Sequence, residues 1–226
     1  MAPHPTGSGQ AETATPNYAA RSRRREETRE RILIKAADFF YRHGITTVSM
    51  EDVAAHAGVT KPTLYAHFDS KEALVGAALN RVEESHFSWF ERRLAEYVDR
   101  GAVPALAPFD VLDLWFKSSV FRGCAYQNAS VEVGSTMPDA QIAVLRHKGR
   151  TRKWLHDLAT VSDVPPERCD ALSAHLMLLM EGAIITAFVE SDEQAAVRAR
   201  EAAEVLLADA RGQGPAAAAP PAPQID

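Results

Sequence analysis

Apolar positions recur at helical spacing along most of the chain, and no stretch keeps a strict alternation of apolar and polar residues. The clearest stripe lies in residues 26–43, where Ile32, Ala36 and Phe40 share one face and Gly44 follows as a stop signal. Because strands are usually marked by period-two patterns, their absence predicts an all-α fold.

Two short helices joined by a tight turn are predicted between Ser49 and Lys71. Ser49 can cap the first helix, and Gly58 can take the left-handed conformation that a sharp helix end requires. Thr60 can cap the second helix, whose first turn accepts Pro62 because no intrahelical N–H is lost there. This arrangement is typical of a helix-turn-helix, in which the second helix enters the DNA major groove.

The outer face of the second helix carries hydroxyls, a cation, a phenol and an imidazole, which are groups that contact phosphates and base edges. We expect Lys61 and Thr63 to read base edges, and we expect Tyr65, His67 and Lys71 to contact phosphates. Further contacts are expected from nearby hydroxyls and guanidiniums, namely Arg24, Arg25, Thr47, Ser49 and Thr60.

Charge is unevenly distributed. The net charge of −5 does not by itself indicate a nucleic-acid binder, but Arg21–Arg25, Arg29 and Arg31 gather positive charge around the start of the first helix. Such a run can be a solvated, disordered arm. Beside a helix-turn-helix, an arm that binds DNA phosphates or the minor groove is favoured.

Residues 26–86 resemble the amino-terminal domain of the TetR/AcrR family of transcriptional regulators. The resemblance rests on A-G-V-x-x-x-x-L-Y-x-H-F-x-x-K-E-x-L from Ala57 onward, preceded by A-A-x-x-F-x-x-x-G from Ala36. Pro62 departs from the family pattern, in which a small residue or glycine is frequent, and should stiffen the start of the second helix. The resemblance implies an all-helical homodimer with a DNA-binding head and a larger body that binds a small ligand.

The composition divides the chain into four parts. Residues 1–20 are rich in Pro, Gly, Ser and Thr and are expected to be a disordered tail. Residues 21–86 form the predicted three-helix DNA-binding head, and residues 87–211 form a helical body for ligand binding and dimerisation. Residues 212–226 are a low-complexity Ala/Pro segment, expected to be a second disordered tail.

The run from Leu176 to Val189 is apolar on every side. All sides of such a helix must be buried. One side can pack on the chain's own core, and a second subunit is the simplest partner for the other side. A monomer with a deeply buried helix is the alternative. The run contains Glu181 and is expected to be too short to span a bilayer, so no membrane partner is predicted. The predicted dimer interface, from the last two helices of each subunit, comprises Leu176, Leu179, Ala183, Ala187, Ala199, Ala202 and Leu206.

Aromatic and soft side chains in the body could line a ligand pocket, with a few polar groups to orient the ligand. For each aromatic taken singly, packing in the core is the favoured interpretation. A bulky hydrophobic ligand with one polar end is expected. The predicted pocket residues are Trp89, Trp115, Phe116, Phe121, Tyr126, Asn128, Trp154, Met177 and Glu181.

Catalytic and metal-binding motifs are absent from the sequence, which has no H-E-x-x-H, C-x-x-C, phosphate loop or G-x-S-x-G. Cys124 and Cys169 are far apart and have no metal-ligand spacing. We therefore expect no catalytic residue, no metal and no cofactor. Unpaired thiols and the lack of an apolar signal segment in residues 1–20 favour a reducing, cytoplasmic location.

These patterns together predict a sequence-specific DNA-binding transcriptional regulator, specifically a repressor released by a small hydrophobic ligand. Its expected partners are a double-stranded DNA operator with two-fold related half-sites, a small-molecule effector and a second copy of the chain. Two alternatives stay open. One is a ligand-independent dimeric DNA-binding or architectural protein. The other is a small-molecule-binding protein or enzyme with a relict head.

Overall fold

The computed structural model describes residues 16–213, and these contain helices and no strand. The prediction of an all-α fold is confirmed. The helices are α1 (Pro16–His43), α2 (Met50–Ala57), α3 (Lys61–Tyr65), α4 (Lys71–Asp99), α5 (Ala107–Phe116), α6 (Ala125–Val133), α7 (Pro138–Thr160), α8 (Pro166–Val189) and α9 (Ala195–Ala210).

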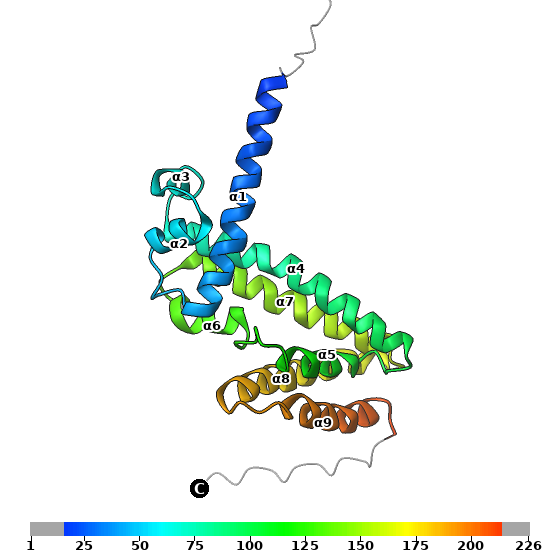
Figure 1. Ribbon diagram of the computed structural model, residues 1–226. Coiled ribbons are helices and arrows are strands. Elements are labelled where there is room, and N and C mark those ends of the chain that lie inside the picture. Colours follow the sequence, from blue (N-terminus) through cyan, green and yellow to red (C-terminus); the bar gives the residue numbers. More distant parts are fainter. Residues whose placement is uncertain (1–15, 214–226) are drawn as a thin grey trace, which may run out of the picture.

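Helices α1 to α3 form a small head, and α4 to α9 form the body (Figure 1). The carboxyl-terminal half of α1 packs on α4 and α2, while the amino-terminal half projects away from the rest of the chain. In the body, α4 lies along α7, α7 packs on α8, and α8 and α9 pair at the far end. Since α4 contacts both α1 and α7, it carries the orientation of the head into the body.

Helix α1 begins at Pro16, well before the predicted start at Glu26. Residues 16–20 are therefore helical, and the prediction that they belong to a disordered tail was wrong. The basic run Arg21–Arg25 lies on a helix rather than on an extended arm. Alanine, arginine and glutamate favour helix, and proline is tolerated in a first turn, but this exposed segment has no apolar stripe to reveal it. The tails predicted within 1–15 and 214–226 lie outside the described residues.

The turn chemistry of the head is as predicted. Ser49 Oγ accepts a hydrogen bond from the Asp52 N–H at 3.1 Å, and the Asp52 carboxylate accepts one from the Ser49 N–H at 2.9 Å. Gly58 adopts the left-handed conformation with φ of 65° at the end of α2. Thr60 caps α3, and the side chain of Leu64 is fully buried, so α3 is pinned against the rest of the head.

Most of the predicted dimer residues face inward. Leu176, Ala183, Ala187 and Ala199 are buried within the subunit, and their assignment to a dimer surface was wrong. The three others, Leu179, Ala202 and Leu206, are half-buried. The reason is that a helix which is apolar on all sides has no periodicity to show which side faces its own core.

Helix α8 is also longer than its apolar run suggested. It is continuous from Pro166 to Val189, and by length and composition alone this whole helix, unlike the shorter apolar run within it, could cross a bilayer. However, 44% of its most apolar window is buried inside the chain, since α8 packs on α7 and α9. Core helices of soluble proteins have the same character.

Candidate DNA-binding head and ligand cleft

The exposed face of α3 centres on Lys61 and Tyr65. The Lys61 ammonium pairs with the Glu51 carboxylate of α2 and lies 5.9 Å from the centre of the Tyr65 ring. This hydrogen-bonded pairing raises the pKa of Lys61 and lowers the pKa of Glu51, so both groups are charged near neutral pH. The positive charge of Lys61, which we expect to contact base edges, is therefore paired with the negative charge of Glu51 when no DNA is bound.

The hydroxyls around α3 serve first as caps. Thr60 Oγ1 accepts from the Thr63 N–H at 3.3 Å and lies 2.8 Å from Thr63 Oγ1. Ser49 Oγ donates to the Asp52 carboxylate at 2.6 Å, while Thr47 is exposed in the preceding loop. These interactions hold α2 and α3 in place, and any contact of the same hydroxyls with DNA stays a prediction.

The basic part of α1 reaches the end of α3. Arg25 Nη2 donates to the carbonyl oxygen of Ala66 at 3.3 Å, and Arg24 is exposed beside it. Burial, together with the charges of Arg25 and Arg29, lowers the pKa of His67. The lowered pKa favours the neutral imidazole, which can still donate a hydrogen bond to a phosphate. The structure brings Arg25 and His67 together, which the sequence pattern alone did not.

Lys71 is turned toward the protein. Its ammonium donates to the Thr46 carbonyl oxygen at 3.4 Å, and burial lowers its pKa. The Glu132 carboxylate of α6 accepts from the N–H of Thr46 at 3.0 Å and from its Oγ1 at 3.2 Å. The loop between α1 and α2 is thus held by the first turn of α4 on one side and by α6 on the other.

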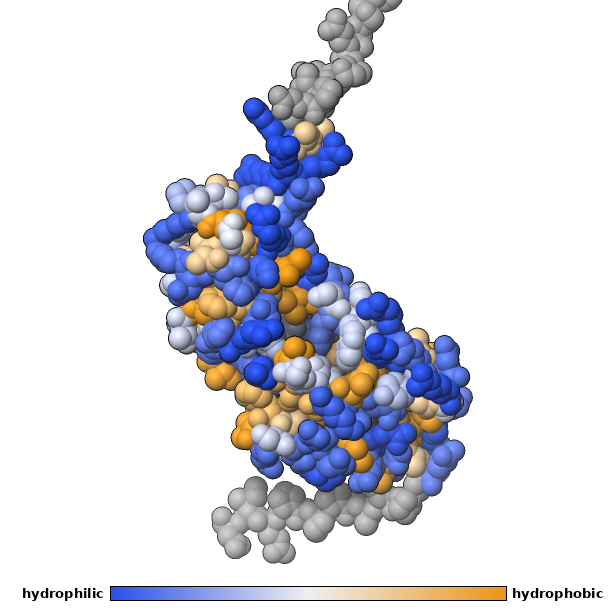
Figure 2. Space-filling view, viewed as in Figure 1, coloured by the Kyte–Doolittle hydropathy of each residue, from blue (hydrophilic) through white to orange (hydrophobic). Residues whose placement is uncertain are grey.

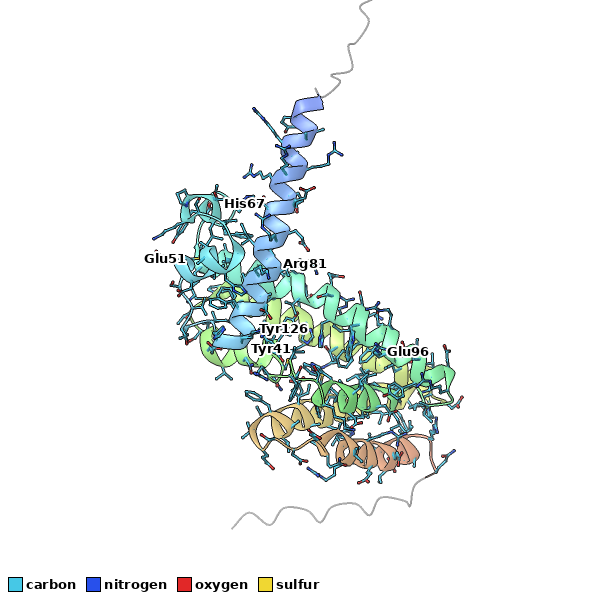
Figure 3. All side chains as sticks on the ribbon, in the orientation of Figure 1. Tyr41, Glu51, His67, Arg81, Glu96 and Tyr126 are labelled. Carbon is cyan, nitrogen blue, oxygen red and sulfur yellow. The ribbon has the colours of Figure 1, made fainter. Side chains whose placement is uncertain are left out.

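A second link between head and body is made by Tyr41, near the end of α1. Its hydroxyl donates to the Gly123 carbonyl oxygen at 2.8 Å and accepts from the Arg122 N–H at 2.7 Å. Burial raises the pKa of Tyr41 to about 12, so the hydroxyl stays a donor throughout the neutral range. Figure 3 shows Tyr41 and Tyr126 where α1 meets the body. Sequence analysis missed both Tyr41 and Glu132, since each acts across a long sequence separation.

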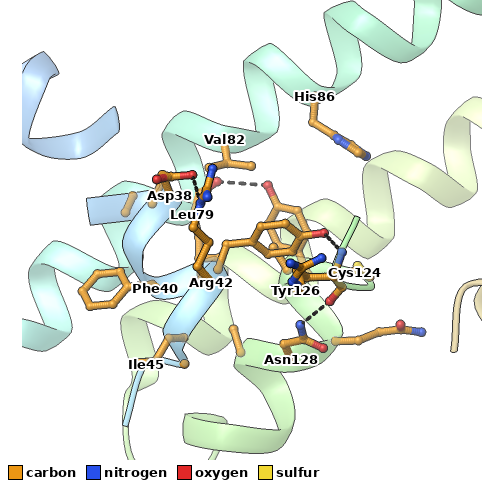
Figure 4. A pocket seen from close by; sticks show the side chains of 18 of the residues that line it. Asp38, Phe40, Arg42, Ile45, Leu79, Val82, His86, Cys124, Tyr126 and Asn128 are labelled. Atoms are coloured by element: carbon orange, nitrogen blue, oxygen red, sulfur yellow. Dashed lines mark hydrogen bonds and ion pairs between the residues drawn. The ribbon is translucent and has the colours of Figure 1, made fainter. Parts of the chain in front are cut away.

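A cleft of about 830 Å³ opens at this junction between α1, α4 and α6, with the end of α8 at one side. Its walls include Phe40, Ile45, Leu79 and Val82, which surround the space seen in Figure 4. In the space-filling view, apolar surface gathers around a hollow where the head meets the body (Figure 2). The volume lies within the range of pockets that hold drug-sized ligands.

A much smaller cavity of about 40 Å³ lies inside the body between α4, α5, α7 and α8. His147 stacks on Tyr126 with ring centres 3.7 Å apart, and its Nδ1 has no hydrogen-bond partner among the described residues. Burial lowers the pKa of His147 to about 3 and the pKa of His86 to about 4. Both imidazoles are therefore neutral at pH 7. His86 lines both this cavity and the larger cleft.

The predicted ligand residues divide between the cavities and the packed core. Trp115, Tyr126 and Asn128 line the cleft, and Trp115, Trp154 and Glu181 line the small cavity. The remaining predicted residues line neither of these two spaces: Trp89, Phe116, Phe121 and Met177. Phe116 and Phe121, for example, pack on each other with ring centres 4.9 Å apart. Composition cannot distinguish an aromatic that fills a core from one that borders a void.

Comparison with known proteins matches this geometry to one family. Residues 32–78, which span the end of α1, all of α2 and α3 and the start of α4, match the model of the family described as "Bacterial regulatory proteins, tetR family". The transcriptional regulator TtgR of Pseudomonas putida is 39% identical over 61 residues, which are 27% of this chain and 29% of that protein. The match to this curated relative thus spans less than a third of its length.

Two other similarities extend into the body. The transcriptional repressor ComR of Escherichia coli is 27% identical over 74% of this chain and 83% of its own length. A solved TetR-family transcriptional regulator from Streptomyces coelicolor superposes with a TM-score of 0.69 and 26% identity, covering 88% of this chain and 98% of that one. The arrangement of head and body is therefore shared with proteins of this type.

Proposed function

Because the chain belongs to the TetR family of bacterial regulatory proteins, we propose that it is a sequence-specific DNA-binding transcriptional regulator. The observation that carries the proposal is α3, capped by Thr60, anchored by the buried Leu64, and exposing Lys61 and Tyr65 on its outer face. The family match covers this unit in full. We propose that α3 enters the major groove, with Thr63 and Lys61 nearest the base edges.

We further propose that the protein is a repressor released by a small hydrophobic ligand, and that it acts in the cytoplasm. Support comes from the contacts that join head and body at one place: Tyr41 to the loop before α6, and Glu132 to the loop before α2. A ligand that favours a different placement of α6 would shift the head through these contacts. Such coupling is usually worth about 1–3 kcal/mol.

The protein is proposed to act as a homodimer on an operator with two-fold related half-sites. An exposed stripe on α8 is formed by Leu178, Gly182, Ile185 and Val189, spaced alternately four and three residues apart. A Cβ added at Gly182 would meet nothing within 4 Å, so another helix can approach closely there. Val205 of α9, the helix that packs on α8, is also 68% exposed. This face, rather than the residues predicted from sequence, is the proposed interface.

Operator binding by purified protein tests the proposal. Fluorescence anisotropy with the DNA upstream of the protein's own gene should show saturable binding that competitor DNA of random sequence does not abolish. Thr63→Ala should weaken this binding roughly tenfold, while Arg152→Gln, an exposed body residue, should leave it unchanged. Equal affinity for specific and random DNA would contradict a sequence-specific regulator. Specific binding that no hydrophobic compound weakens would favour the ligand-independent alternative.

A further inference from the structure

The cleft between α1, α4 and α6 is large enough to be a ligand site, whereas the inner cavity is not. The cleft measures about 830 Å³, and the cavity between α4, α5, α7 and α8 measures about 40 Å³. Small-molecule pockets usually hold about 300–1,000 Å³. Of these two spaces, only the cleft at the junction of head and body can therefore hold an organic molecule.

The inner walls of the cleft are apolar and come from both parts of the molecule. Helix α1 and its following loop contribute Phe40 and Ile45, and α4 contributes Val75, Leu79 and Val82. Burial of such walls favours an occupant with a substantial apolar surface, at about 25 cal/mol per Å² removed from water. Because the walls belong to separate elements, one occupant would contact the head and the body at once.

The charged groups of the cleft are paired, with one exception. Arg42 pairs with Asp38 at 2.7 Å, and Arg81 pairs with Glu30 of α1. The Glu132 carboxylate is bonded to Thr46, and burial keeps His86 neutral.

Arg122 is the exception, because no carboxylate lies within 4.0 Å of its guanidinium in the part of the chain that the structure describes. Its Nη1 donates to the carbonyl oxygen of Phe121 at 2.7 Å, which leaves further N–H donors for a ligand. The cleft thus combines apolar walls with one exposed cation, Arg122, that pairs with no carboxylate among the described residues.

We propose that this cleft binds an elongated apolar molecule with a single carboxylate, and that Arg122 is the residue that pairs with the carboxylate. A guanidinium and a carboxylate form charge-assisted, often bidentate hydrogen bonds, which suit this assignment. An uncharged molecule of the same shape would keep the apolar contacts but would leave Arg122 unpaired.

The position of Arg122 gives the ligand a direct route to the head, a consequence that rests on the proposed function. The Arg122 N–H donates to the Tyr41 hydroxyl, and its carbonyl oxygen accepts from Asn128 Nδ2 at 3.1 Å. A ligand that pairs with Arg122 therefore contacts the residue that joins α1 to the start of α6. The ligand changes operator affinity only if it binds more tightly to one position of the head, the position that fits DNA or the position that does not, than to the other.

Binding is tested without DNA, using the uncharged N-phenyl-1-naphthylamine as a fluorescent probe of the cleft and decanoate and decanol as matched competitors. Wild-type protein should bind the probe saturably, and decanoate should displace it at lower concentration than decanol. Arg122→Gln should raise the decanoate concentration needed by roughly tenfold and leave decanol unchanged. Arg122→Lys should recover part of the loss, and Arg152→Gln should match wild type.

A substitution that fills the cleft tests the proposal without changing Arg122. Val82→Trp places a large side chain on the half-buried α4 wall and should reduce binding of probe and both competitors together. Circular dichroism and thermal unfolding establish that each variant is folded. The proposal is overturned if Val82→Trp folds and binds the probe like wild type, or if Arg122→Gln affects decanoate and decanol equally. Because operator binding is measured separately, failure of the regulator assignment would show only in the anisotropy experiment.

Discussion

The head and the body of this protein are determined by interactions of different range. In the head, Ser49 bonds Asp52, Thr60 bonds Thr63, and Gly58 turns the chain within a few residues. In the body, the contacts that set the site join residues distant in sequence. The comparison indicates that a DNA-reading unit can be specified locally, whereas a ligand site depends on how separate helices come together.

Charged groups follow the same division. Lys61 and Glu51 of the head pair on the surface, where solvent screens them. In the body, the side chain of Glu83 is only 3% exposed and depends on Arg146 of α7 at 2.9 Å. One Glu83 oxygen, Oε1, is buried without a hydrogen-bond partner among the described residues. The body therefore depends on polar contacts between residues far apart in the chain, and no short sequence motif predicts these contacts.

The largest effect is expected from Leu64→Ala, which removes the fully buried anchor of α3. Truncation of a buried leucine to alanine typically costs about 2–5 kcal/mol. Operator binding should be lost, while probe binding in the cleft should survive because α3 contributes no residue to its walls. Denaturant unfolding and the probe titration measure the two outcomes, with Leu64→Met as the volume-conserving control. Loss of probe binding in a folded variant would show that the two regions are not separable in this way.

A pH effect should arise in the body from His147. Its pKa is about 3 in the folded chain against 6.5 for the free group. Between these values the unfolded chain holds a proton that the folded chain lacks, so stability falls as the pH drops from about 6.5 toward 3, by at most about 1.4 kcal/mol per pH unit. His147→Phe keeps a ring against Tyr126 and should flatten this dependence.

The control for this titration is His43→Gln, which removes an exposed histidine of the head. Urea unfolding at pH 7.0, 6.0 and 5.0 gives the slope of the free energy of unfolding against pH for each variant. Wild type and His43→Gln should lose stability in parallel on acidification, and His147→Phe should lose less. An identical slope in all three proteins would mean that His147 is protonated in the folded state.

The head could be predicted almost completely from sequence because its determinants are short-range. The helix caps and the left-handed glycine each leave a local mark in the sequence, and all were found where expected. The early start of α1 was missed because a solvent-exposed helix needs no apolar stripe. Propensity alone favours helix there, and it is a weak signal beside periodicity.

The site in the body could be predicted only in part. Prolines mark the starts of α7 and α8, and glycines follow the ends of α4, α6 and α9. The cleft, however, depends on Tyr41, which bonds Arg122, and on Glu132, which bonds the loop after α1. Aromatic composition suggested Trp115 and Tyr126, which line the cleft, and also Phe116, which does not. Whether a ring fills the core or borders a void depends on packing between helices, which one sequence does not display.

A smaller effect is expected from Ser49→Ala, which breaks the reciprocal cap of α2. Loss of such an N-cap usually costs about 1 kcal/mol. Hydrogen exchange should show faster opening of α2 amides, with little change in α7, because the cap is local. Ser135→Ala, in the exposed turn after α6, serves as the control. Faster exchange spread evenly through α7 as well would contradict the local character of the head.

The smallest effect is expected from Glu51→Gln, and it has the opposite sign. Glu51 holds the Lys61 ammonium on the face that is proposed to meet DNA, so its removal frees the cation and takes away one negative charge. Because exposed ion pairs are weak, operator affinity should rise by only about two- to fivefold. The slope of log affinity against log salt should also steepen, because a cation freed beside the DNA favours counterion release. Glu91→Gln, which removes the same charge from exposed α4, should change neither quantity. An equal gain in both variants would attribute the effect to net charge and leave Lys61 without a role at the base edges.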